Sequence, residues 1–306
     1  ITVSAGSLSM DGSAIASAND TSGAAGNAGD VTVNVTGDAT ITGTHSELAS
    51  GHGVNLAIGT FTKGSGNAGN VTITANNLRI DRDGDIISKT RSTGHTGNIT
   101  IKVTETMEVL NGTWVNTNTE DQGDAGSITV TAKNLIIDSG GIRAEAESYD
   151  GEDGSDSYLS TGNTGAVSVE VTELLKIQNN GVIESVSIAG SAGTVTIKAA
   201  NLEMSNGLIA SVRDGYESTT GDTGGVVIDV TGDMTVSGSR SEGGDSLTIG
   251  IAAFNGNGNA GPVTMNIGGT LTLVNTGIAT SAQSGAAGNI YIDPPAIKIT
   301  NSRITT

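Results

Sequence analysis

The sequence predicts an all-β protein, a right-handed parallel β-helix of ten coils with three short strands in each coil. Three observations predict this solenoid. One glycine motif recurs nine times, the copies are spaced by a base unit of about 28 residues that is longer in three coils, and the composition favours strands over helices. Gly, Asn, Thr and Ser interrupt almost every ten-residue window, while the apolar share is carried by Ile, Val, Leu and Ala.

The recurring motif is Gly-x-x-Gly-x followed by alternating apolar residues, as in GNAGNVTI and GDAGSITV. Its second glycines are Gly29, Gly69, Gly97, Gly126, Gly165, Gly193, Gly224, Gly261 and Gly288. Because the opening Ile1-Thr2-Val3 continues the pattern, we expect first strands to start at Ile1, Val31, Val71, Ile99, Ile128, Val167, Val195, Val226, Val263 and Ile290. We interpret the glycines as turn residues at the corners of the coils.

The spacings between these starts define a coil of about 28 residues. Three strands are readable in the clearest coil, at 71–73, 78–80 and 86–88. The turns at Asn76-Asn77 and Asp83-Gly84 between these strands are expected to need positive φ. Two types of connection between the first and second strands alternate along the middle of the chain. One type carries Asn77, Asn134 and Asn201, which we interpret as turn residues rather than as residues of a ligand site.

Alternation along each strand points Val, Ile and Leu inward, so stacked coils would form continuous aliphatic columns. No coil could bury that face alone, and stacking at about 4.8 Å does it. We therefore expect residues 1–306 to form a single β-helix domain, a segment of a longer protein. A bare terminal coil exposes core and strand edges, so we expect it to pair with another copy end to end or with flanking repeats.

The net charge of −18 argues against nucleic acid and anionic membranes as partners. The chain has no Cys, which fits a long exported protein, and no apolar run approaches the roughly 18 residues of a membrane helix. The chain opens in repeat phase, so any export signal is expected outside it.

The GNAGNVTITANNLRI style of repeat resembles the repeat regions of filamentous-haemagglutinin-like exoproteins of bacterial two-partner secretion. The resemblance covers nearly the whole chain, although the secretion domain of that family is not recognisable in it. It implies a secreted, cell-surface, fibre-forming protein with a role in adhesion or biofilm, and a host or matrix glycan or protein as receptor.

Three coils are long, and their extra segments lie at 44–53, 148–161 and 239–245. Loops on a rigid scaffold often carry binding, although tolerated insertion is the interpretation that the sequence favours. The middle segment is acidic, and Asp150, Glu152, Asp153 and Asp156 form a weak Ca²⁺ candidate. A solvated acidic loop is the alternative that the sequence favours, because the spacing matches no known calcium loop. We expect no other cofactor.

Parallel β-helices also host polysaccharide-acting enzymes and carbohydrate-binding modules, whose chemistry needs paired carboxylates with sugar-stacking aromatic residues on one exposed face. The best local candidates are Asp81, Arg82, Asp83 and Asp85, but the chain has few aromatic residues and no catalytic set emerges. The histidines, at 45, 52 and 95, have no metal-ligand spacing and are expected in surface loops. We therefore expect a protein that is not an enzyme.

Trp114 and an outward threonine column are two further features of the sequence. Trp114 is expected at a third-strand position that holds Ile in other coils, packed in the core, with an outward contact position as the alternative. An outward column contains Thr32, Thr72, Thr100, Thr129, Thr196 and Thr264, which suggests ice binding. Val227 and Tyr291 interrupt this column, and a charged neighbouring column breaks the flat threonine array, so exposed β-branched strand residues are the better interpretation.

Overall fold

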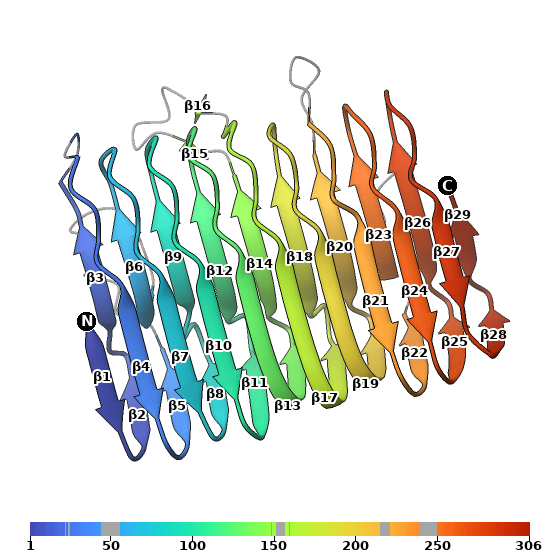
Figure 1. Ribbon diagram of the computed structural model, residues 1–306, viewed down its shortest axis with the longest axis horizontal. Helices are drawn as coiled ribbons and strands as arrows, with labels where there is room; N and C mark the ends of the chain where they lie inside the picture. The colour runs from blue at the N-terminus through green and yellow to red at the C-terminus, as the bar shows by residue number, and fades with distance from the viewer. Residues whose placement is uncertain are drawn as a thin grey trace.

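The computed structural model describes residues 1–21, 23, 25–43, 56–147, 149–150, 157–158, 160–214, 221–238 and 250–306. Every regular element in these ranges is a β-strand. The strands wind into stacked coils that advance from the amino to the carboxyl terminus along one axis (Figure 1). With the amino terminus at the left, the first strands run downward in front and the third strands run upward behind, so the β-helix is right-handed.

Each coil contributes a first, a second and a third strand. The first strands are β1 (Thr2–Ala5), β4 (Val31–Val35), β7 (Val71–Ala75), β10 (Ile99–Val103), β21 (Val226–Val230), β24 (Val263–Ile267) and β27 (Ile290–Asp293). The second strands are β2 (Leu8–Asp11), β5 (Ala39–Thr42), β8 (Leu78–Asp81), β11 (Thr106–Leu110), β22 (Met234–Ser237), β25 (Thr270–Val274) and β28 (Ala296–Thr300). In coils five to seven the first two strands merge into one bent strand, β13 (Ile128–Asp138), β17 (Val167–Gln178) or β19 (Val195–Ser205).

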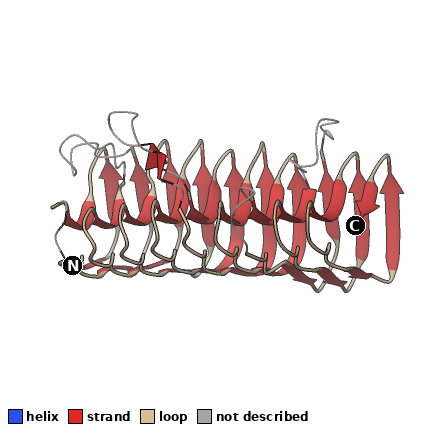
Figure 2. Ribbon diagram, turned by 90° about the horizontal axis from the view of Figure 1, so that it is seen from above, coloured by secondary structure: helices blue, strands red, loops and turns tan. Residues whose placement is uncertain are grey.

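The third strands form a separate sheet on the opposite side (Figure 2). They are β3 (Ile15–Asn19), β6 (Ile58–Thr62), β9 (Ile86–Thr90), β12 (Trp114–Thr119), β14 (Gly141–Ala146), β18 (Val182–Ser187), β20 (Leu208–Arg213), β23 (Gly250–Asn255), β26 (Gly277–Ala282) and β29 (Arg303–Thr305). The described strands thus make a 17-stranded sheet of first and second strands and a 10-stranded sheet of third strands, with parallel pairing throughout both. This arrangement confirms the predicted fold class.

The register between coils follows the glycine repeat. Val31 pairs with Val71, Ile99 with Ile128, and the same alignment continues to the last coil. The expected first-strand starts agree with the structure, except that β1 begins at Thr2. One residue of slip would turn each aliphatic side chain to the outside, so burial of the inward face holds this register.

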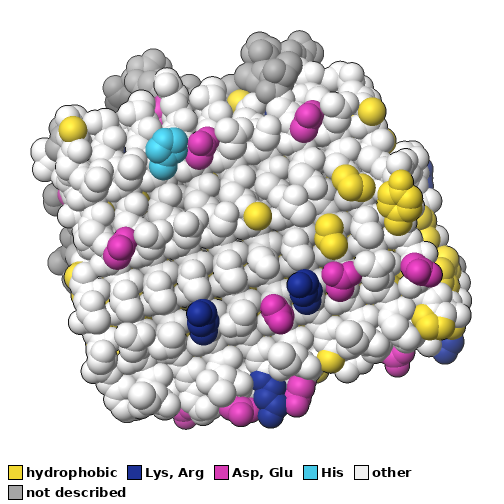
Figure 3. Space-filling model, viewed as in Figure 1, with side chains coloured by type: hydrophobic (Ala, Val, Ile, Leu, Met, Phe, Trp, Pro, Cys, Tyr) yellow, Lys and Arg dark blue, Asp and Glu magenta, His cyan; other side chains and the backbone are white. Residues whose placement is uncertain are grey.

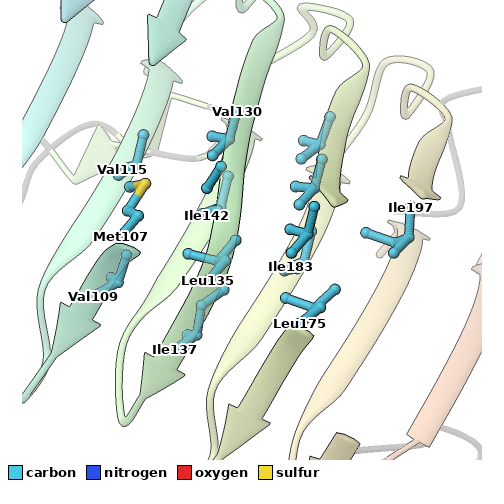
Figure 4. Packing of buried hydrophobic residues seen from close by; sticks show 14 of the residues in the cluster. Met107, Val109, Val115, Val130, Leu135, Ile137, Ile142, Leu175, Ile183 and Ile197 are labelled. Atoms are coloured by element: carbon cyan, nitrogen blue, oxygen red, sulfur yellow. The ribbon is translucent and has the colours of Figure 1, made fainter. Parts of the chain in front are cut away.

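Aliphatic columns fill the interior between the sheets. Val130, Leu135, Ile137 and Ile142 are fully buried within coil five, and Leu175 and Ile183 repeat the arrangement in the next coil (Figure 4). The same columns extend from Met10 to Ile278 as a single hydrophobic cluster. The core is therefore a stack of small equivalent layers, as the composition predicted.

The second glycine of the repeated motif lies at the corner between a third strand and the next first strand. A Cβ atom added at Gly97 would lie 2.1 Å from the carbonyl oxygen of Gly69, in the preceding coil. Thr60 and Thr117 are buried on the third strands and donate their hydroxyls at 2.7 Å to the carbonyls of Gly69 and Gly126. Close approach of stacked main chains, rather than a left-handed φ, therefore requires glycine at this corner.

Left-handed backbone is concentrated instead at the corner between the second and third strands. Arg82, Asp83, Asn111 and Asn206 have φ between 50° and 63° there. The positive φ expected at Asn76-Asn77 is wrong, because neither residue has one. The corner between the first and second strands turns without a left-handed residue at those positions.

The long segments interrupt coils two, five and eight. The first and third lie between a second and a third strand, after β5 and after β22, and the middle one follows β14. Residues 44–53 and 239–245 lie outside the described residues. Within 148–161, β15 (Tyr149–Asp150) pairs antiparallel with β16 (Ser157–Tyr158). In the chain, each of the three segments therefore directly precedes or follows a strand of the third-strand sheet.

Candidate functional site

The outer surface of the third-strand sheet carries a cluster of charged side chains in coils three to six. We call this cluster the third-face network, and it consists of Lys89, Arg91, Trp114, Asn116, Asn118, Glu120, Arg143, Glu145, Glu147 and Glu184. These residues lie at or just after outward positions of β9, β12, β14 and β18, so the parallel register brings them side by side. No sequence expectation included them as a group.

Arg143 is the centre of the carboxyl-terminal half of the network. Its guanidinium donates to Glu184 at 2.5 Å and to Glu145 at 3.0 Å. The guanidinium also lies 4.4 Å from the centre of the Trp114 ring, within the range of a cation–π contact. The other carboxylate oxygen of Glu145 accepts from the amides of Asn116 and Asn118 at 3.1 and 3.3 Å.

Lys89 is the centre of the other half. Its ammonium contacts Glu120 and lies 3.8 Å from Glu147. Arg91 pairs with Glu120 at 2.9 Å and lies 5.8 Å from the ring centre of Phe61. Because Asn118 donates to Glu147 at 2.5 Å, the two halves form one continuous network.

Burial makes these charges interact strongly. The side chains of Glu145 and Glu184 are only 11% and 7% exposed. Burial raises the pKa of Glu145, while the nearby Arg143 cation opposes that rise. Burial lowers the pKa of Arg143, but attraction to Glu145 and Glu184 outweighs it and the pKa ends above the ordinary value. Loss of one partner would leave the others buried without compensation.

Trp114 lies on the outside of the third-strand sheet, so the expected core position is wrong. Val115 takes the interior position in line with Ile86 and Ile142, and Trp114 aligns with Gly141. A Cβ atom at Gly141 would lie 2.4 Å from the indole ring, which shows how closely the ring covers that glycine. The alignment of this coil in the sequence was one residue out of register, because Trp and Val are both plausible inward residues.

The predicted carboxylate candidates lie at the second corner of coil three. Asp81 accepts hydrogen bonds from Arg79 at 2.8 Å and from Asn111 at 2.7 Å. Both bonds lower the pKa of Asp81, and the bond from Asn111 has the larger effect. Asp85 accepts from the main-chain N–H of Trp114 at 2.7 Å, and burial raises its pKa to about 6. Arg82 and Asp83 form the left-handed turn. Asp81 and Asp85 thus bind different structural partners, and both brace this corner.

The predicted asparagines occupy the corner between the first and second strands. Asn77, Asn134 and Asn201 accept from the main-chain N–H groups of Thr106, Leu174 and Asp233 in the following coils. Their side-chain carbonyls therefore accept hydrogen bonds from main-chain N–H groups that have no main-chain partner at this corner. Asn134 also donates to Glu173 at 3.4 Å.

The other predicted sites are only partly visible. Asp150 belongs to β15, whereas Glu152, Asp153 and Asp156 of the calcium candidate, together with His45 and His52, lie outside the described residues. His95 is exposed, and its Nδ1 accepts from the N–H of Asp124 at 2.9 Å. Within the described residues, no set of three or more acidic or histidine side chains is arranged to hold a metal ion.

The outward threonine column lies in register on the first-strand face. Thr32, Thr72, Thr100 and Thr129 pair successively, and Val227 and Tyr291 interrupt the column where expected. Figure 3 shows few charged side chains on this face, spread among uncharged polar side chains and main chain, with hydrophobic side chains towards the carboxyl-terminal end.

No helix among the described residues has the length and apolar character needed to cross a membrane. Comparison with known proteins identifies no relative: no family model, no curated protein and no solved structure matches the chain.

Proposed function

We propose that this chain is a structural or adhesive segment of a secreted bacterial surface exoprotein, and that its role is not enzymatic. The observation that carries the proposal is the parallel pairing of the first, second and third strands of each coil with those of the next, from the first coil to the tenth. A stack in which each coil contacts only its neighbours forms a rod whose length grows with coil number. A rod suits a protein that must hold a contact surface away from the cell.

An extracellular location is supported by sequence and surface chemistry. The chain has no Cys and a net charge of −18, which suits a soluble exported fibre. The glycine repeat resembles filamentous-haemagglutinin-like exoproteins of two-partner secretion, which form fibres in adhesion and biofilm. We infer the same class of role for this chain.

The proposed structural partner is another β-helical coil, from a second copy or from flanking repeats. Ile297, Ile299 and Ile304 in coil ten are 45%, 51% and 40% exposed. The residues that align with them in coil nine, Leu271, Leu273 and Ile278, are fully buried. A coil of the same cross-section seated on β28 and β29 would bury these side chains in the same way.

The proposed external partner is a glycan or protein of a host or matrix. The test is binding of the purified chain to immobilised glycans and matrix proteins, with a reducing-sugar assay on the same glycans. A matched control replaces residues 238–249 by the two residues, Asn275-Thr276, that join β25 to β26 in the next coil. Binding without cleavage supports an adhesive role. Cleavage of a glycan would contradict it.

The second candidate is a carbohydrate-binding module or polysaccharide-acting enzyme, and one observation favours it. In the third-face network, the Oδ1 atoms of Asn116 and Asn118 are buried and accept no hydrogen bond from the described residues. Sugar hydroxyls are donors that would suit such acceptors. Stacking on Trp114 is not favoured, because Gly141 and Arg143 lie against its ring.

The variants Asn116→Ala and Asn118→Ala separate the two candidates. If glycan binding is lost in both variants while each still unfolds in urea in one cooperative transition, the network is the binding site. If binding persists in both, the adhesive surface lies elsewhere and this second candidate fails.

A further inference from the structure

The first-strand face carries two columns of outward side chains, and each coil contributes one residue to each column. The first column, in coils one to nine, consists of short uncharged side chains: Thr2, Thr32, Thr72, Thr100, Thr129, Ser168, Thr196, Val227 and Thr264. The second column lies two residues further along each strand and consists of Ser4, Asn34, Thr74, Lys102, Thr131, Glu170, Lys198, Asp229 and Asn266. The charges of these residues therefore all lie in the second column.

Lys102 differs from the other charged residues of the second column. Lys198 lies between Glu170 and Asp229, so each of these three residues has an opposite charge in an adjacent coil. Lys102 lies between two threonines of the adjacent coils. Its side chain is exposed, and it forms no ion pair with any residue that the structure describes. The charge of Lys102 is therefore available to a partner on this face.

A second copy of the chain provides such a partner when the two first-strand faces meet across a two-fold axis. With the axis parallel to the strands and passing through coil five, the order of the coils is reversed and the direction of the strands is kept. Each column then faces itself, with coil four opposite coil six. Lys102 lies opposite Glu170 of the second copy, and the symmetry makes this contact twice.

The other facing pairs are compatible with this arrangement. Asn34 lies opposite Asp229 of the second copy. Because the Oδ1 atom of Asn34 accepts from Thr74 at 3.1 Å, its amide N–H groups can donate to that carboxylate. In the first column only short side chains meet, as Thr100 and Ser168 do. No charge of the two columns therefore faces a like charge.

The charges favour this position of the axis over its neighbours. An axis moved by half a coil towards the carboxyl terminus places Lys102 opposite Lys198, and an axis moved by a whole coil places Glu170 opposite itself. Like charges that face each other across an interface are strongly unfavourable. Positions still closer to the carboxyl terminus pair Lys198, which already has carboxylate neighbours in its own chain, and they overlap fewer coils.

The overlap of the two faces is large enough for a specific dimer. Coils one to nine overlap, which gives a length of about 40 Å, and strands of five residues give a width of about 15 Å. Counted over both copies, the dimer would bury about 1,200 Å², which is above the roughly 1,000 Å² that a specific interface needs.

We propose that the first-strand face is a self-association surface, through which two rods pair side by side in opposite directions with Lys102 of each rod opposite Glu170 of the other. The third-strand faces of both rods, with the third-face network, then point outward. This inference goes beyond the proposed function and does not depend on it, because it rests on the charge pattern and the area of one face.

The first test is the oligomeric state of the full chain by sedimentation equilibrium, with small-angle X-ray scattering on the same samples. The proposal expects a dimer with a larger cross-section than a single rod and a nearly unchanged length. End-to-end stacking would double the length and keep the cross-section. A chain that is monomeric at every concentration measured, or a dimer of doubled length, would overturn the proposal.

The second test uses the variants Lys102→Glu and Glu170→Lys. Each variant alone places like charges opposite each other at both symmetric contacts, so its dimer dissociation constant should rise at least about tenfold. An equimolar mixture of the two variants should dimerise again, because the mixed pair has opposite charges at both contacts. Single variants that dimerise as tightly as the natural chain, or a mixture that stays monomeric, contradict the facing pairs.

Lys198→Gln is the matched control, because Lys198 is exposed in the same column and lies opposite Thr74 of the second copy. Its dimer dissociation constant should be unchanged. If Lys198→Gln weakens the dimer and Lys102→Glu does not, the axis lies elsewhere and the proposal is wrong. Cooperative unfolding in urea checks that each variant folds, since Lys102, Glu170 and Lys198 are all exposed.

Discussion

The first-strand face and the third-strand face differ, although the same aliphatic columns line the inner side of both. On the first-strand face the outward residues of coils three to five are threonines, such as Thr72, Thr100 and Thr129, apart from the exposed Lys102. On the third-strand face the outward residues of the same coils are Lys89, Asn116 and Arg143, which join a buried charge network. The same scaffold therefore has one face on which most outward residues are uncharged and another face that carries a charge network.

This difference separates what stacks the coils from what the coils present. Inward residues are interchangeable between coils because each fills the same layer. Outward residues meet only their neighbours in adjacent coils, so a functional set can be assembled on one face without disturbing the core. In the chain, the long segments of coils two, five and eight directly precede or follow a third strand. We infer that this side of the rod is the one under functional constraint.

The largest expected effect comes from breaking the network at its centre. Arg143→Met leaves Glu145 and Glu184 buried without their cation, and we expect a loss of about 3 to 5 kcal/mol in the free energy of unfolding at pH 7. The matched control is Lys198→Met on the first-strand face, where the side chain is exposed and no loss is expected. Urea titration measures both. Equal losses would erase the contrast between the faces.

Removing the charge of Asp85 should stabilise the protein at neutral pH. The folded-state pKa is raised by burial to about 6, so the stabilising contribution of the protonated form is present below about pH 4 and is lost as the pH rises through 6. Asp85→Asn keeps an acceptor for the N–H of Trp114 and has no charge to bury. The variant should melt at a higher temperature than the natural protein at pH 7, with the gap closing near pH 4. A gap that is constant with pH would show that Asp85 does not titrate in this range.

The effect of a lysine substitution on stability should depend on salt for an exposed lysine and not for a buried one. Lys89 is 15% exposed and pairs with the buried Glu120, whereas Lys133 is 39% exposed and pairs with Glu105 at 3.0 Å. Lys89→Met should lower the urea midpoint at both low and high NaCl, because buried pairs are little screened. Any effect of Lys133→Met should disappear in about 1 M NaCl. Disappearance of the Lys89 effect as well would mean that the network is solvated.

The smallest expected effect is on the threonine column. Thr100→Ala or Thr129→Ala removes an outward hydroxyl on the first-strand face, and each should change the free energy of unfolding by less than about 0.5 kcal/mol. Thermal unfolding measures the change. A loss several times larger would show that this face is packed against something in solution.

The fold could be predicted from the sequence because the inward pattern repeats in every coil. The register of Val31, Val71 and Ile99 follows from the glycine motif, and stacking is the only way to bury such a face. The third-face network could not be predicted in the same way, since Lys89, Glu120 and Arg143 occupy different outward positions in different coils. Alignment of the third strands on Ile86, Val115, Ile142 and Ile183 was the signal that could have found it.

Two local interpretations failed for related physical reasons. Trp114 was assigned inward because a one-residue shift exchanges the faces of a strand, and Val115 beside it is equally apolar. The turn at Asn76-Asn77 was expected to be left-handed because asparagine tolerates positive φ, but here the side chain of Asn77 serves as an acceptor for the next coil. Contacts between coils, which a single repeat does not reveal, decide both positions.

The central claim, that successive coils stack in parallel register, is tested most directly by engineered disulfides, because the chain has no Cys of its own. Thr100 and Thr129 are register partners, about 4.8 Å apart as neighbouring strands require, which is within reach of a disulfide. The account predicts that the pair Thr100→Cys and Thr129→Cys cross-links on mild oxidation, whereas Thr100→Cys with Thr131→Cys, shifted by two residues, does not. Cross-linking of the shifted pair, or of neither, would contradict the parallel register from which the rod is inferred.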